Sequence, residues 1–129
     1  WGGAAGGESA LLMRPSNDLP VVYLCRVPVD FRKGIPGLGV LVEERLGLDP
    51  FSEHLFVFCN RRRDRVKILY WERNGFCLWV KRLERQRFHW PKEIEAVVSI
   101  SGQQLNWLLD GYDISRLKPH KRLCYSSLL

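Results

Sequence analysis

The sequence predicts a single α+β domain in which an antiparallel β-meander is accompanied by two short helices. Apolar and polar residues alternate with a period of two between about residues 55 and 90. Two segments with a period near 3.6, at about 36–46 and 102–110, flank this region and carry helix-boundary residues. The length of 129 residues suits one domain, and 46% apolar with 26% charged residues is typical of a globular protein.

We expect the folded domain to occupy residues 13–116. Residues 1–12 are rich in Gly and Ala and precede the sole methionine, Met13, so they are interpreted as a disordered extension or a cloning remnant. The basic and then Ser/Leu-rich tail, 117–129, has no periodicity and is predicted to be mobile. No apolar run approaches the ~18 residues that span a bilayer, and the start lacks the basic region of a signal peptide. These features predict a cytoplasmic protein without membrane contact.

The first strand is predicted at Val21–Cys25, a β-branched and aromatic run that follows a proline. Asp30 is expected to be an N-cap, because its carboxylate can accept from free backbone N–H groups of the next turn. The first helix is predicted from Pro36 to Leu46, with Gly47 ending it and Asp49-Pro50 forming a turn.

The meander is predicted from four strands: Leu55–Cys59, Val66–Trp71, Phe76–Lys81 and, less securely, Arg87–Trp90. Asn74-Gly75 predicts a tight hairpin, since both residue types tolerate positive φ. One face is expected to carry Val66, Ile68, Tyr70, Phe76, Leu78, Val80, Phe88 and Trp90. The other is expected to carry Lys67, Leu69, Trp71, Cys77, Trp79, Lys81, Arg87 and His89.

After the meander, Val97–Ile100 is a candidate strand, and Ser101 with Gln104 forms a capping box. The helix that follows should bury three leucines before it ends at Gly111: Leu105, Leu108 and Leu109.

Positive charge is concentrated in one segment. Residues 61–92 hold eleven basic and three acidic residues, a net +8 that exceeds the +6 of the whole chain. Such a segment is typical of a protein that binds a polyanion, although a solvated basic surface has the same composition. The nucleic-acid-binding candidates are Arg61, Arg62, Arg63, Arg65, Lys67, Trp71, Trp79, Lys81, Arg82, Arg85 and Arg87.

Two arrangements of these candidates remain open. Cations and large rings on the second predicted face of the meander could contact phosphates and stack on bases, or a helix could cover that face and make Trp71 and Trp79 core residues. The arginines of the turn at 61–65 are expected to be exposed, either binding a partner or simply solvated. Arg32 and Lys33 are candidate contacts to DNA or a protein partner, because cations in a first helical turn oppose the helix dipole. The alternative for this pair is a capping turn whose cations reach into water.

No residue pattern predicts catalysis, a metal or another cofactor, or a small-molecule substrate. The four cysteines have no zinc-ligand spacing, and we expect Cys25, Cys59 and Cys77 to be structural thiols in apolar strands. The aspartates each have a simpler role at a cap or turn. The chain also lacks a phosphate-binding loop and a nucleophile elbow. We therefore do not expect an enzyme.

Four stretches resemble one known family: PVDFRKGIPGL (28–38), LGLDPFSEHLFVF (46–58), NRRRDRVKILYWERNGFCLWVKRLERQRFHWP (60–91) and, more loosely, SISGQQLNWLLDGYD (99–113). In this order they resemble the accessory protein encoded by the second reading frame of insertion sequences of the sixty-six type. That protein is often labelled TnpB, a label shared with an unrelated RNA-guided nuclease that this chain does not resemble.

The resemblance implies a role in transposition beside a separate transposase that carries its own carboxylate triad. It implies the transposase of the same element as a partner. DNA is a candidate partner because of the basic segment at residues 61–92, with association with the nucleoid if DNA is bound. An adaptor that binds the transposase or a companion accessory protein without touching DNA is the alternative. The chain departs from the family at Pro36, where an acidic residue is frequent, and at Arg63, where Gly is common. Residues 1–12 have no family counterpart.

Overall fold

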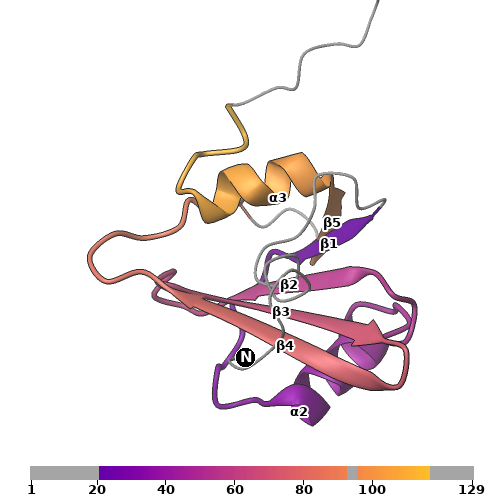
Figure 1. Cartoon of the computed structure of the whole chain (residues 1–129). Coiled ribbons are helices and arrows are strands. Elements are labelled where there is room, and N and C mark those ends of the chain that lie inside the picture. The colour runs from indigo at the N-terminus through magenta and orange to yellow at the C-terminus, as the bar shows by residue number, and fades with distance from the viewer. Residues whose placement is uncertain (1–20, 93–95, 117–129) are drawn as a thin grey trace, which may run out of the picture.

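The computed structural model describes residues 21–92 and 96–116, and both flanks predicted to be mobile lie outside this part. Its centre is a five-stranded sheet in the order β4-β3-β2-β1-β5 (Figure 1). The strands are β1 (Val22–Cys25), β2 (Leu55–Cys59), β3 (Arg65–Glu72), β4 (Gly75–Arg82) and β5 (Val97–Ile100). The α+β prediction is confirmed, and β2, β3 and β4 form the expected antiparallel meander.

The pairing of β1 with β2 is parallel, which the sequence did not predict. Parallel neighbours need a crossover connection, and the first helical segment supplies it. This segment is α2 (Ile35–Val40), followed by a turn of π-helix, η1 (Leu41–Arg45), in which the Leu46 N–H donates to the Leu41 carbonyl at 3.1 Å. The second helix, α3 (Gly102–Leu109), lies on the opposite side of the sheet from α2 (Figure 1).

Each face of the sheet forms its own apolar core. On the α3 side, Leu55, Val57 and Cys59 of β2 pack with the leucines of the helix. On the α2 side, Phe56 and Phe58 of the same strand pack with Leu38 and Val42. Every residue of β2 is buried, so this strand separates the two cores and requires a helical layer on each face.

The predicted faces of the β3–β4 hairpin are wrong. Ile68 pairs with Trp79 and Leu69 pairs with Leu78, and the loop consists of Arg73 and Asn74 between Glu72 and Gly75. A two-residue loop always places an odd-numbered residue opposite an even-numbered one, whereas the expectation grouped residues of like parity across the hairpin. The positive φ, 54°, belongs to Arg73, and Asn74-Gly75 is not the loop.

The expected strand at Arg87–Trp90 is also wrong, because this segment has no ladder partner in the described structure. Its alternation is nevertheless real, since Phe88 and Trp90 are buried against the α3-side core. Two hydrogen bonds fix it: the Phe88 N–H donates to the Arg63 carbonyl at 2.7 Å, and Trp90 Nε1 donates to the Cys25 carbonyl at 2.9 Å.

Asp30 is not the N-cap of the first helix, contrary to expectation. The N-cap is Gly34, which has no side chain to cap with, and Asp30 instead accepts from the backbone N–H of Arg32 at 2.9 Å. Arg32 and Lys33 therefore precede the helix, and the argument from the helix dipole does not apply to them. A backbone turn, with the Lys33 N–H donating to the Asp30 carbonyl at 3.1 Å, explains these residues.

Predictions that rested on strictly local signals are confirmed. Ser101 and Gln104 exchange both hydrogen bonds of the capping box, at 2.8 and 3.0 Å. Gly47 and Gly111 follow their helices with φ of 66° and 98°. Cys25 and Cys59 are buried in the apolar cores of the two faces, and burial raises the pKa of Cys59 to about 12. Cys77 is a free thiol that is half-buried.

The β2–β3 turn holds Arg63 at a φ of 62°, a conformation that favours Gly. Because a Cβ atom at this backbone conformation costs roughly 1 kcal/mol, we expect Arg63→Gly to raise the free energy of unfolding by about 0.5–1 kcal/mol. Urea denaturation measures this change. Arg63→Ala removes the same charge but keeps the Cβ, so it should not stabilise the protein, and equal gains in both variants would contradict the explanation.

Candidate nucleic-acid interface

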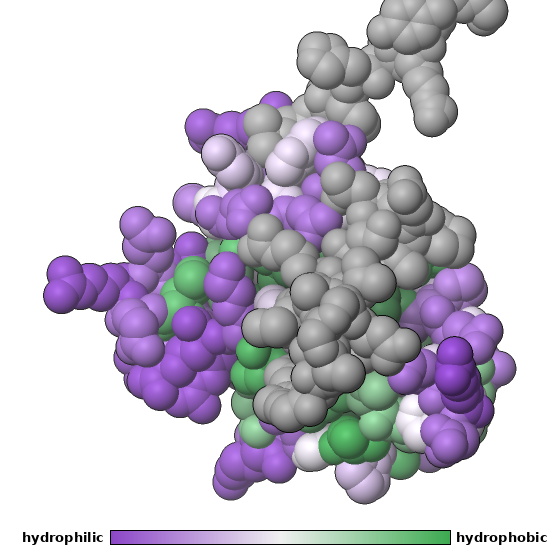
Figure 2. Space-filling view, viewed as in Figure 1, coloured by the Kyte–Doolittle hydropathy of each residue, from purple (hydrophilic) through white to green (hydrophobic). Residues whose placement is uncertain are grey.

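Seven arginines predicted to bind nucleic acid lie at one end of the sheet. The segment after β4 is tied to the β2–β3 turn by two backbone hydrogen bonds, from Leu83 to Asp64 at 2.8 Å and from Phe88 to Arg63 at 2.7 Å. Arg65 and Arg82 are directly paired on neighbouring strands. All seven are exposed: Arg61, Arg62, Arg63, Arg65, Arg82, Arg85 and Arg87. We call this group the arginine end, and Figure 2 shows the hydrophilic surface that it forms at the left.

The turn that carries four of these arginines is organised by Asn60. Its side-chain oxygen accepts from the backbone N–H groups of Asp64 and Arg65, each at 3.1 Å, while its amide nitrogen donates to the Asp64 carboxylate at 2.6 Å. This hydrogen bond from Asn60 lowers the pKa of Asp64 below its usual range. The only acid in the turn is therefore used to hold it together, and the arginine side chains are left to solvent.

Two open hollows lie on either side of this turn, and Arg61 and Arg62 line both. The first, about 590 Å³, is also lined by Arg65 and by the loop at residues 28–32. The second, about 850 Å³, lies between the turn and the extended segment at 87–92. Its basic residues are Arg26, Arg61, Arg62, Arg63, Arg87 and Lys92, with His89 and Asp113 beside them. Arginine side chains such as those that line both hollows can form charge-assisted hydrogen bonds to phosphate groups.

Lys67 and Lys81, also predicted to bind nucleic acid, make internal hydrogen bonds. Lys67 Nζ donates to the carbonyl oxygens of Phe31 and Lys33, at 2.9 and 3.0 Å, and burial lowers its pKa. Lys81 Nζ donates at 2.8 Å to the carbonyl of Leu109, the last residue of α3. A cation at a helix C-terminus satisfies a carbonyl that has no partner within the helix. Both lysines therefore connect the sheet to neighbouring backbone.

The predicted face that combined cations with Trp71 and Trp79 does not exist. The register places these two rings on opposite faces of the sheet. Trp79 is only 9% exposed and belongs to the core on the α3 side. Trp71 packs against Phe51 and Phe76, which lie at the end of the sheet opposite the arginines.

Arg32 and Lys33 are both exposed, but only Arg32 lies beside the arginine end, where it lines the first hollow. Its guanidinium forms an ion pair with Asp30 and donates hydrogen bonds to the Asp30 carboxylate. These hydrogen bonds lower the pKa of Asp30 to about 2. The sequence did not single out Arg26 or Lys92 as site residues, although both line the second hollow. Arg26 directly follows a buried strand, and a charged residue at such a position is the signal that could have identified it.

Among the residues that the structure describes, the carboxylates do not converge on a common site. Asp49, Asp64 and Asp113 each hold a turn by hydrogen bonds to nearby backbone or side chains. In residues 21–92 and 96–116, no three His, Cys, Asp or Glu side chains are grouped so that they could hold a metal ion. No helix in the same part of the chain is long and apolar enough to cross a membrane.

Comparison with known proteins agrees with the resemblance noted in the sequence. The family model described as "IS66 Orf2 like protein" matches residues 20–119. Uncharacterized protein y4hO of Sinorhizobium fredii is 39% identical over 101 residues, which cover 78% of this chain and 88% of that protein. Uncharacterized protein y4jC of the same organism is 35% identical over 113 residues, covering 86% and 96%. No solved structure matches. The chain therefore belongs to the IS66 Orf2-like proteins, the accessory proteins of IS66-type insertion sequences.

Proposed function

We propose that this protein assists transposition by holding duplex DNA through the phosphate backbone at its arginine end. The observation that carries the proposal is the convergence of seven exposed arginines at one end of the sheet. Membership of the IS66 Orf2-like family supports the role in transposition. Binding of DNA accounts for the concentration of charge, because phosphate contacts by arginine supply most of the sequence-independent affinity of DNA-binding proteins.

The arrangement favours duplex phosphates over unpaired bases. Proteins that bind single strands combine cations with exposed aromatic rings on which bases stack. The large exposed hydrophobic residues in the described part of the chain are Val40, Phe51, Val80 and Tyr112, and none of them lines either hollow. Phe88 and Trp90, which do line the second hollow, are buried. We therefore expect little sequence preference.

An adaptor with no DNA contact is the second candidate, in which the arginine end meets an acidic surface of the transposase. Pull-down with the purified transposase, with and without nuclease treatment, separates the two. Loss of the complex on nuclease treatment supports a DNA bridge, whereas its survival together with no measurable DNA binding by the protein alone supports the adaptor.

DNA binding should depend steeply on salt. With ~5 phosphate contacts, the logarithm of the binding constant should fall against the logarithm of salt concentration with a slope of about −4.5. Replacing Arg61, Arg62 and Arg65 by Ala should make the slope less negative by about 2 to 3 without unfolding the domain. Electrophoretic mobility shift measures this slope between about 50 and 200 mM salt, roughly the range over which phosphate contacts weaken.

Arg62→Ala and Lys81→Met form a matched pair for this assay, because each removes one positive charge. Arg62→Ala should make the slope less negative by about 0.9 and leave the free energy of unfolding unchanged. Lys81→Met should leave the slope unchanged but lower the free energy of unfolding by about 1–3 kcal/mol, because it removes a hydrogen bond to the end of α3. Equal effects of the two changes on the slope would show that only net charge matters and would remove the arginine end as the contact.

We expect no DNA cleavage or joining by the purified protein with Mg²⁺ or Mn²⁺. Two-metal chemistry needs carboxylates that converge on the ions. Asp30, Asp64 and Asp113 each hold a local turn, and no metal-binding group of three His, Cys, Asp or Glu is found among the described residues. Gel analysis of a labelled element end, with the transposase alone, this protein alone and both together, tests this expectation. Cleavage by this protein alone that is abolished by Asp30→Asn or Asp64→Asn would overturn it.

A further inference from the structure

The end of the sheet opposite the arginines carries an aromatic cluster of three rings. Phe51 lies in the turn before β2, Trp71 in β3 and Phe76 in β4. Their ring centroids are 5.0 to 5.2 Å apart, with edge-to-face or tilted geometry. Phe51 covers the other two rings and is itself 53% exposed. We call these three residues the Phe51 patch.

The turn presents Phe51 in a fixed position. The Asp49 carboxylate accepts from the Phe51 N–H at 2.9 Å, and the Ser52 N–H donates to the Asp49 carbonyl at 3.2 Å. A half-exposed aromatic ring that is already ordered loses little conformational entropy when a partner covers it. Large aromatic anchors of this kind supply much of the binding energy at protein interfaces.

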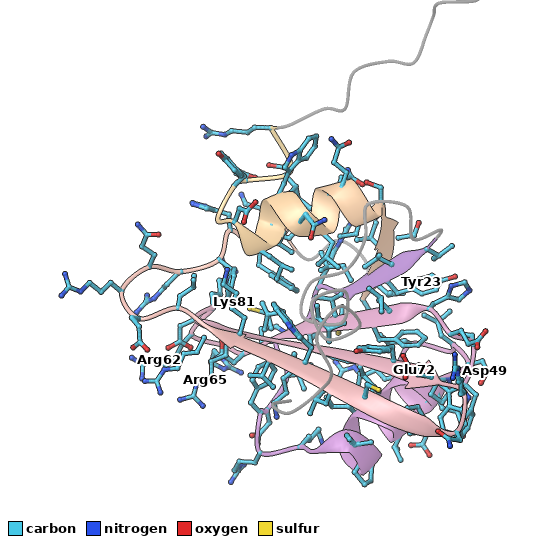
Figure 3. The ribbon with its side chains drawn as sticks, viewed as in Figure 1. Tyr23, Asp49, Arg62, Arg65, Glu72 and Lys81 are labelled. Carbon is cyan, nitrogen blue, oxygen red and sulfur yellow. The ribbon has the colours of Figure 1, made fainter. Side chains whose placement is uncertain are left out.

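Three carboxylates and one cation lie close to the patch in the chain. Glu72 directly follows Trp71, Asp49 and Glu53 are each two positions from Phe51, and Arg73 follows Glu72 in the β3–β4 loop. All four side chains are exposed, so the acids outnumber the cation. In the view of Figure 3, Asp49 and Glu72 both lie at the end of the sheet opposite Arg62 and Arg65. In the view of Figure 2, hydrophobic surface borders hydrophilic surface at the lower right, next to this end. The molecule therefore has a basic end whose hollows are lined by none of the large exposed hydrophobic side chains of the described chain, and an acidic end that exposes Phe51.

The acidic charge decides which occupant suits the patch. The three carboxylates outnumber Arg73, and their net negative charge disfavours the DNA phosphates proposed for the arginine end. A protein segment that carries Arg or Lys beside an apolar residue fits both features, since its cation can pair with the carboxylates and lie against aromatic rings. A protein that acts on DNA carries such basic segments.

We propose that the Phe51 patch docks a basic segment of the transposase encoded by the same insertion sequence. The protein would then hold DNA at one end and the transposase at the other. The two surfaces are formed by different residues, so either proposal can fail without the other.

Binding of the purified transposase to the immobilised protein, measured by biolayer interferometry in the absence of DNA, tests the proposal. Phe51→Ala should weaken binding at least about tenfold, as truncation of an aromatic anchor does. Tyr112→Ala is the matched control, because Tyr112 is an aromatic residue that is 56% exposed but follows α3 on the other side of the sheet. It should leave the affinity unchanged.

A second pair of variants tests the acidic rim without disturbing the aromatic packing. Glu53→Gln with Glu72→Gln should weaken binding and flatten its dependence on salt. Glu43→Gln with Glu44→Gln removes the same charge from η1 and should have no effect. Circular dichroism melting of each variant verifies that it is folded.

The arms of the experiment also separate this proposal from DNA binding. The Phe51 variant should still bind DNA, and the variant in which Arg61, Arg62 and Arg65 are replaced by Ala should still bind the transposase. The proposal would be overturned if the unmodified protein did not bind the transposase. It would also be overturned if the folded Phe51 and Glu53/Glu72 variants bound the transposase as tightly as the unmodified protein does. Equal losses in the Phe51 and Tyr112 variants would do the same, since they would place the contact elsewhere.

Discussion

The burial of β2 on both faces is the constraint on which the rest of the structure depends. All five residues of this strand are buried, so one helical layer cannot complete the core. The crossover between β1 and β2 places α2 and η1 over Phe56 and Phe58, and the C-terminal part of the described chain places α3 over Leu55 and Val57. With both faces covered, the ends of the sheet and its edges are what remains for contacts with other molecules.

This arrangement explains why cations of the same segment have different roles. Lys67 and Lys81 lie within strands whose faces are covered, so their ammonium groups reach nearby backbone carbonyls at the margins of the helical layers. The arginines lie in the β2–β3 turn, at the adjoining ends of β3 and β4, and in the segment after β4. Asn60 and backbone groups satisfy the local hydrogen bonds there. Their guanidinium groups stay in solvent, where they are available to phosphates.

The two ends of the sheet differ in charge and in the kind of side chain that they expose. Arg62 and Arg65 mark one end, and Asp49 and Glu72 mark the other (Figure 3). Because the strands hold these ends apart in one sheet, the surface proposed for a polyanion and the surface proposed for a basic protein segment do not overlap. That separation is compatible with the proposal that this accessory protein holds DNA and the transposase at the same time.

The sequence by itself determined the features whose signals lie within one turn of chain. The capping box at Ser101, the glycines that follow both helices and the positions of the first three meander strands depend on neighbouring residues, and the exposure of the arginine turn follows from its composition. Tertiary structure alone decided the parallel pairing of β1, the face on which Trp79 lies, the path of residues 87–90 and the use of the lysines. Each of these depends on which distant backbone lies opposite a residue, and a shift of one position in strand register moves every side chain to the other face.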